Sequence, residues 1–334
     1  MITINSEVLG KAVSTGRLIG KVEGNHEGPT LVLLGGMHGN EPFGVFAISE
    51  ILNHLEGLKG QLHGKVYGFA GNLKALESRQ RYVDEDLNRL WRDDVLKGLD
   101  HEKWPEARWN NELHQLVELR QELNQVLDEA KGPSYFIDLH TTSASGGPFM
   151  FMTHTPANLK YSEYFPVPAI VGIDKYIKGA LLSLVSKRGY VSLAFEGGQH
   201  EDPASFDLMR DFSWLSLAAT GCLTPELIPN LRERFNRLKT ESALPGLVFD
   251  MLYRHPVIPE DQFEMRSGFE SFQRIAKGDW LANDRNGRIK AEFNGHLFMP
   301  LYQKQGEDGF FLIGEMATAN SPLDLETSSS EAPS

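Results

Sequence analysis

Cysteine is almost absent from this sequence: Cys222 is the single one among 334 residues. An intrachain disulfide is therefore impossible, and a zinc site built from cysteine thiolates is excluded as well. Because a free cysteine is usually a small buried apolar residue, we expect Cys222 to lie in the core. The lack of a disulfide framework favours a reducing compartment, so we expect a cytoplasmic protein.

Long apolar runs and an excess of basic charge are missing too. No apolar run reaches the roughly 18 residues that would suggest a membrane span, and the first residues, MITINSE, lack the pattern of a signal peptide. The formal net charge is -12, whereas nucleic acids and anionic membranes bind a concentrated basic face. We therefore expect neither as a partner. A small acidic ligand stays compatible, because it needs only a few local cations.

The sequence does contain the apolar residues of a large folded protein. Hydrophobic residues make up 41% and charged residues 23% of the chain, which is typical of globular proteins. The length allows a large core with a smaller appendage.

Short apolar runs alternate with helical patterns over the first two thirds of the chain. Strands are predicted at residues 30–36, 65–70, 135–139, 149–152 and 190–195. Helices are predicted after Pro42, over 105–131 with a stripe of Leu113, Leu116, Val117, Leu123 and Leu127, and around 225–240. This alternation indicates an α/β fold, a largely parallel sheet flanked by helices. Its ligand site is expected beyond the carboxyl ends of the strands.

The pattern of the sequence changes near residue 245. Short segments separated by glycine, asparagine and aspartate replace the helical periodicity. We therefore predict a larger domain over residues 1–244 and a small β-rich C-terminal domain over 245–320. Residues 321–334 (SPLDLETSSSEAPS) are rich in serine and acids, and we expect a disordered tail there.

His38 and Glu41 stand three residues apart in a glycine-rich turn. This spacing lets both side chains reach one metal, and the glycines let the backbone bend sharply. The pair alone occurs by chance in a chain with 11 histidines, so a third ligand is required. His140, at the end of the strand YFIDL, is the candidate, and Asp138 could orient its imidazole. Catalytic zinc takes three such ligands and keeps one position open for water.

Three segments in this order, GGMHGNE, RYVDEDLNR and DLHTT, resemble the aspartoacylase and succinylglutamate desuccinylase family, whose fold is related to the zinc carboxypeptidases. The resemblance covers residues 30–200 firmly and the C-terminal part loosely. It implies one zinc ion per chain, held by His38, Glu41 and His140.

The resemblance also implies roles for four further residues. Arg81 would polarise the scissile carbonyl, Asn88 and Arg89 would hold the carboxylate of the substrate, and Glu196 would be the general base and acid. The chemistry agrees, because a guanidinium grips a carboxylate with two hydrogen bonds. One glutamate can take a proton from a metal-activated water and return it to the amine. The alternative is that both arginines pair with the acids at 84–86 on the surface and that Glu196 is a surface acid.

Two features of the family are matched less closely. Family members that act on acetylaspartate carry an arginine ahead of the catalytic glutamate, where this chain has Lys187 and Arg188 without a clear register. Recognition of a second substrate carboxylate therefore stays open. Tyr302 is matched to a C-terminal tyrosine that closes over the site, with strand packing as its alternative. His154 and His200 lie near the motifs and are interpreted as loop residues.

Together these residues predict a zinc-dependent hydrolase that cleaves the amide bond of a small anionic N-acyl amino acid, of the N-acetyl or N-succinyl type. One alternative is a zinc carboxypeptidase that acts on short peptides, and another is a non-catalytic binding relative. The sequence leaves open the acyl group, the amino acid and the oligomeric state, with a homo-oligomer among the compatible arrangements.

Overall fold

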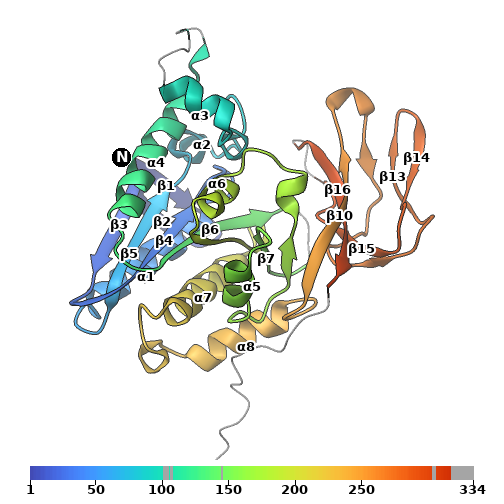
Figure 1. The fold of residues 1–334 in the computed structure, drawn as a ribbon. Coiled ribbons are helices and arrows are strands. Elements are labelled where there is room, and N and C mark those ends of the chain that lie inside the picture. Colours follow the sequence, from blue (N-terminus) through green and yellow to red (C-terminus); the bar gives the residue numbers. More distant parts are fainter. Residues whose placement is uncertain (101–104, 106–107, 144–145, 303–305, 317–334) are drawn as a thin grey trace, which may run out of the picture.

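One large sheet organises the protein (Figure 1). The computed structural model describes residues 1–100, 105, 108–143, 146–302 and 306–316. In spatial order the strands of the 11-stranded sheet are β12 (Arg274–Ile275), β15 (Gly295–Phe298), β16 (Asp308–Glu315), β10 (Val248–Pro256), β8 (Ala169–Val171), β7 (Phe149–Met152), β9 (Val191–Gln199), β6 (Ser134–Thr142), β4 (His26–Gly35), β5 (His63–Ala70) and β3 (Leu18–Glu23). From β10 to β5 all neighbours are parallel except β7 and β9.

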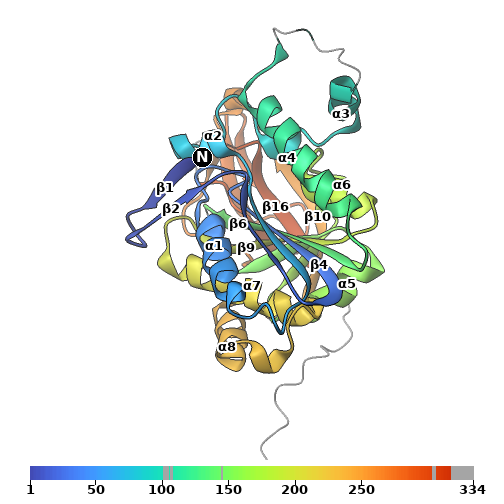
Figure 2. The same ribbon diagram turned by 90° about the vertical axis from the view of Figure 1, so that its left-hand side faces the viewer.

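Helices cover both faces of this sheet (Figure 2). Successive residues of a strand point to opposite faces, and in β4 Leu31 and Leu33 join one hydrophobic cluster while Val32 and Leu34 join the other. The first cluster includes side chains of α1 (Phe43–Glu56), α5 (Pro156–Ser162), α7 (Pro203–Thr220) and α8 (Leu231–Glu241). The second includes side chains of α3 (Asp93–Asp100), α4 (Asn111–Asp128) and α6 (Leu181–Lys187). A strand that is buried on both sides reads as a continuous apolar run.

The remaining elements are short. They are the hairpin β1 (Ile2–Ser6) and β2 (Lys11–Thr15), the helix α2 (Leu73–Ser78), and the 3-10 helices η1 (Leu87–Arg89), η3 (Ile173–Lys175), η4 (Pro225–Leu227) and η5 (Pro259–Asp261). A separate three-stranded sheet consists of β11 (Glu264–Met265), β13 (Trp280–Asp284) and β14 (Gly287–Lys290).

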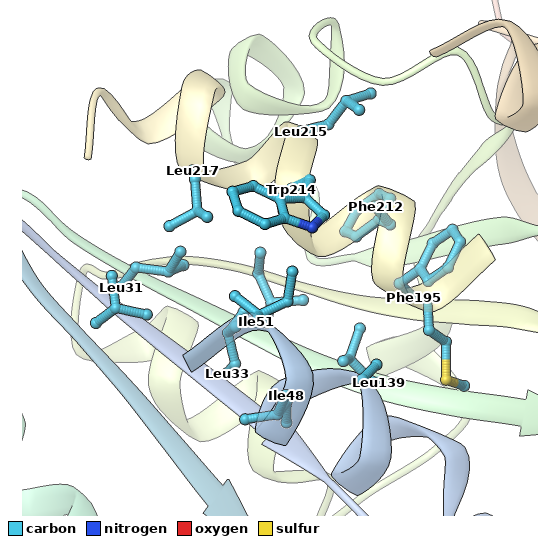
Figure 3. Close-up of a cluster of buried hydrophobic side chains, with 14 of the residues drawn as sticks. Leu31, Leu33, Ile48, Ile51, Leu139, Phe195, Phe212, Trp214, Leu215 and Leu217 are labelled. Atoms are coloured by element: carbon cyan, nitrogen blue, oxygen red, sulfur yellow. The ribbon is translucent and has the colours of Figure 1, made fainter. Parts of the chain in front are cut away.

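The cluster between the sheet and the helices α1 and α7 is drawn in Figure 3. Phe212 of α7 stacks on Phe195 of β9, with ring centroids 3.9 Å apart. Ile48 of α1 and Trp214 of α7 belong to the same buried set. Fully burying such a side chain stabilises the fold by about 1.5–3 kcal/mol. Cys222 also belongs to this cluster, so its predicted burial is confirmed.

The predicted α/β fold is confirmed, with two details of one helix wrong. The helix predicted over 105–131 is α4, which spans only Asn111–Asp128. Val117 was predicted in the buried stripe of α4, but the residue is 37% exposed. The buried face instead passes through Leu116, Leu119 and Leu123, which follow the 3.6-residue period. The helix begins at Asn111 because the side chain of Asn110 accepts a hydrogen bond from the backbone N–H of Leu113.

The C-terminal region continues the central sheet. Strand β10 pairs in parallel with β8, and β16 pairs antiparallel with β10. The proposed domain division at residue 245 stays a prediction, although the hydrogen-bonded ladder crosses it. The predicted disordered tail, 321–334, lies outside the described residues. Among the described helices, none is both long enough and apolar enough to cross a membrane.

Candidate metal centre and active-site cavity

The turn after β4 places His38 at the carboxyl end of the sheet. Gly36 has a φ of 70°, a conformation that favours glycine. At Gly39 a Cβ atom would lie 2.0 Å from the carbonyl carbon of Ala75, so only glycine fits there. Helix α1 begins directly after Pro42. The glycines of the GGMHGNE segment are therefore explained by this tight connection.

Three side chains that are distant in sequence converge here. His38 Nδ1 lies 2.9 Å from Glu41 Oε1, and His140 Nδ1 lies 2.9 Å from Glu41 Oε2. One ligand atom from each residue falls within 4.8 Å of the others, and all three residues are buried. The structure thus brings together the three residues that the sequence analysis selected as ligands.

The outer nitrogen of each imidazole contacts a carboxylate. His140 Nε2 lies 2.9 Å from Asp138 Oδ2, and His38 Nε2 lies 3.2 Å from Asp86 Oδ1. Metal-ligating histidines usually have such a partner, which fixes the ring and leaves the other nitrogen for the metal. Asp138 was predicted from the sequence in this role, whereas Asp86 was predicted only as a possible surface partner of the arginines.

The charges of the cluster suit a divalent cation. Burial opposes ionisation of Glu41, but the adjacent His38 and His140 outweigh it and hold the pKa of Glu41 well below its usual range. Two imidazoles with one carboxylate form a donor set that zinc accepts at catalytic sites. The residues present therefore fit the metal that the sequence resemblance implies.

Glu196 lies beside this cluster on the neighbouring strand. It pairs with His140 in the β6–β9 register and with Phe149 in the β7–β9 register. Its Oε2 atom is buried and contacts no hydrogen-bond partner among the described residues. Burial raises the pKa of Glu196 to about 7, with His140 opposing and Glu41 adding to that rise. A carboxyl group with this pKa can both accept and donate a proton near neutral pH.

The RYVDEDLNR segment contributes two arginines and an asparagine. Arg81 Nη2 donates to Asp86 Oδ2 at 3.0 Å, and Arg81 Nη1 lies 3.7 Å from Glu41 Oε1. Arg89 makes only long ion pairs, 3.9 Å to Asp86 and 3.8 Å to a carboxylate of β16. The side-chain oxygen of Asn88 accepts a hydrogen bond from the backbone N–H of Leu181 at 2.9 Å.

Buried Glu112, near the start of α4, holds this segment in place. Its two carboxylate oxygens accept hydrogen bonds from the backbone N–H groups of Val83, Asp84 and Glu85 at 2.8, 2.9 and 3.3 Å. A fourth bond comes from the side chain of Asn72 at 2.9 Å. Glu112 was not predicted from the sequence, because the partners that justify burying a glutamate come together only in three dimensions.

A cavity of about 660 Å³ joins these residues. It is lined by the three candidate ligands, Arg81, Asn88, Arg89, Asp138 and Glu196, among others. Strands β10 and β16 add Arg254 and Asp308 from the C-terminal region. His200 also lines it, with Nδ1 2.7 Å from the hydroxyl oxygen of Thr141. No pattern in the sequence indicated Arg254, Asp308 or a cavity position of His200.

The structure does not bring the other candidates to the cavity. The hydroxyl of Tyr302 bonds to the backbone of Arg266 and Phe269, and the residue is 43% exposed. The guanidinium of Arg188 donates to the side chain of Asn124 at 2.6 Å. Lys187 and His154 are likewise absent from the lining residues of this cavity.

The fold and the His38–Glu41–His140 cluster define the class of protein. It is an α/β protein with a candidate divalent-metal centre at the carboxyl edge of its sheet. Residues 27–187 match the model of the succinylglutamate desuccinylase/aspartoacylase catalytic domain. Over these residues the chain is similar to this family.

Known relatives are similar over part of their length. The chain is 28% identical over 137 residues to a probable aspartoacylase of Trichodesmium erythraeum, which covers 40% of this chain and 43% of that protein. It is 29% identical over 167 residues to a succinylglutamate desuccinylase of Photorhabdus laumondii, covering 49% and 47%. The match thus spans less than half the length of these curated relatives.

The fold is shared over most of the chain with solved structures. A succinylglutamate desuccinylase/aspartoacylase from Rhodobacter sphaeroides superimposes with a TM-score of 0.63, covering 89% of this chain and 88% of that one. The sequence identity is 18%, so this likeness concerns the fold alone.

Proposed function

We propose that the protein is a zinc-dependent hydrolase that cleaves the amide bond of an N-acyl amino acid. The observation that carries this proposal is the convergence of His38, Glu41 and His140 within 4.8 Å, in a cavity that also contains Glu196. The match to the family model supports the reaction type, because the named relatives are a probable aspartoacylase and a succinylglutamate desuccinylase.

The proposed chemistry divides among four side chains and one metal. When bound, zinc would lower the pKa of water and polarise the acyl oxygen. Glu196 takes a proton from the attacking water and returns it to the departing nitrogen, so that the C–N bond breaks and a C–O bond forms. Arg81 offers positive charge beside the developing oxyanion. Asn88 and Arg89 hold the carboxylate of the amino acid.

The test is a panel of N-acetyl amino acids, N-succinyl amino acids and short peptides, assayed with zinc-loaded and chelator-treated protein. We expect zinc-dependent release of a free amino acid from the N-acyl compounds. Hydrolysis of peptides alone would replace the proposal by a carboxypeptidase. A protein that binds one zinc ion and hydrolyses nothing in the panel would instead be a non-catalytic relative.

A further inference from the structure

The cationic side chains of the cavity differ in how firmly carboxylates of the protein hold them. Among the described lining residues they are Arg81, Arg89 and Arg254. Arg81 is bonded to Asp86 at 3.0 Å, and the Nε of Arg254 donates to Asp308. Arg89 alone of the three has no carboxylate closer than 3.8 Å. The described cavity therefore offers one guanidinium for one carboxylate of a ligand.

A different part of the lining is hydrophobic. We call it the apolar wall, and its residues are Phe151, Ile173, Ile177, Leu182, Met299 and Phe311. All belong to, or pack against, one hydrophobic cluster. Ile173, Ile177 and Met299 are only partly buried, so they keep apolar surface that a ligand could cover. Met299 has a φ of 48°, which is uncommon outside glycine.

The part of the apolar wall with Ile177 and Leu182 lies next to the pair that is proposed to bind the carboxylate. The backbone N–H of Leu181 donates to the side chain of Asn88 at 2.9 Å, and the backbone N–H of Trp91 donates to the carbonyl oxygen of Gly179 at 3.1 Å. These bonds fasten the segment between Ile177 and Leu182 beside Asn88 and its neighbour. An amino acid held there by its α-carboxylate would share the cavity with the apolar wall.

We infer that the substrate is an N-acyl amino acid with one carboxylate and a large apolar side chain. This inference rests on the proposed function. The α-carboxylate pairs with Arg89, and the side chain covers the apolar wall. A second carboxylate, as in aspartate or glutamate, would lose hydration against the apolar wall, and the other two guanidinium groups among the described lining residues are already paired.

The first experiment compares kcat/KM of the zinc-loaded protein for N-acetylleucine, N-acetylalanine, N-acetylaspartate and N-succinylglutamate. We expect N-acetylleucine to exceed each of the others by about tenfold or more, because apolar pocket contacts discriminate by that order. An equal or higher kcat/KM for N-acetylaspartate, with two carboxylates, or for N-succinylglutamate, with three, would overturn the inference and leave the proposed hydrolase function standing.

A matched pair of variants tests the apolar wall itself. Ile177→Lys places a cation on the wall, and we expect the preference for N-acetylleucine over N-acetylaspartate to fall about tenfold, mainly through KM. Val117→Lys makes the same change on the exposed face of α4 and should keep the wild-type ratio. An unchanged ratio in a folded Ile177→Lys protein would contradict the role of the wall.

Calorimetry separates failure of this inference from failure of the proposed function. Binding of N-acetylleucine and N-acetylaspartate is measured on the zinc-loaded Glu196→Gln protein. This measurement requires neither turnover nor a variant of the apolar wall. We expect N-acetylleucine to bind about tenfold more tightly. If nothing in the panel is hydrolysed, the proposed function fails, and this affinity ratio still decides the ligand class. Equal affinities would overturn it.

Discussion

Asp86 connects two parts of the candidate centre at the scale of single residues. One of its oxygens contacts His38 and the other accepts from Arg81. Burial alone would raise the pKa of Asp86, but His38 and Arg81 hold it well below the usual range. The carboxylate thus stays ionised, so it can fix the imidazole and the guanidinium at the same time.

We expect Asp86→Asn to weaken zinc binding by about 10–100-fold, because the outer partner of a ligating histidine tunes its orientation and basicity. Competition with a chromophoric chelator measures the affinity. Asp93→Asn, a neighbouring surface acid on α3, is the control and should bind zinc like the wild type. An Asp86→Asn protein with wild-type affinity would show that His38 needs no such support.

Glu196→Gln should keep bound zinc and lose activity by a factor of about 10²–10⁴, the usual contribution of a general base. The side chain keeps its size while losing the ability to accept a proton. Zinc content by metal analysis and kcat on the best N-acyl substrate are measured together. Near-wild-type turnover would remove Glu196 from the proposed chemistry.

At the scale of elements, Glu112 ties α4 to the segment that carries Arg81 and Asp86. We expect Glu112→Gln to lower both Tm and kcat/KM. The amide has only one oxygen that accepts hydrogen bonds, so a buried backbone N–H group loses its acceptor, at a cost of about 1–3 kcal/mol. Thermal unfolding and steady-state kinetics measure the two effects. Glu122→Gln on the same helix is the control. Equal effects of the two substitutions would argue against a role of Glu112 in holding this segment.

The helices α7 and α8 are joined by a buried ionic contact. Asp211 of α7 is fully buried and accepts from Arg234 at 2.5 Å and from Arg237 at 2.7 Å. Asp211→Ala should lower the free energy of unfolding by about 3 kcal/mol, because it leaves a poorly exposed guanidinium without its partner. Urea unfolding measures the change. Asp207→Ala on the same helix serves as the control. If Asp211→Ala lowers the free energy of unfolding by less than the control does, the ionic contact does not stabilise the fold.

Some elements could be predicted from the sequence, and others could not. The predicted strands were recognisable because double burial makes nearly every residue of a strand apolar. Helix α7 went unpredicted, since buried Ser205, Ser213 and Ser216 interrupt its apolar pattern. Ser213 and Ser216 bond to backbone carbonyl groups four residues earlier, a solution that hydropathy does not reveal.

At the scale of the whole molecule, the candidate centre joins strands β4, β6 and β9 with the segment after β5. A metal that binds only the folded state stabilises it by about 2.7 kcal/mol at a hundredfold excess over its Kd. We therefore expect zinc to raise the apparent Tm of the chelator-treated protein. His140→Ala should abolish the zinc-dependent shift, whereas a shift that persists in this variant would place the metal elsewhere.

The sequence by itself determined the α/β class and the three candidate ligands, because apolar runs and short motifs are local properties of the chain. Only the tertiary structure decided which distant groups share the cavity. Asp86, Glu112 and Arg254 acquire their roles through neighbours that are far away in sequence or in another element. Side-chain contacts of this kind arise from packing, and no local pattern encodes them.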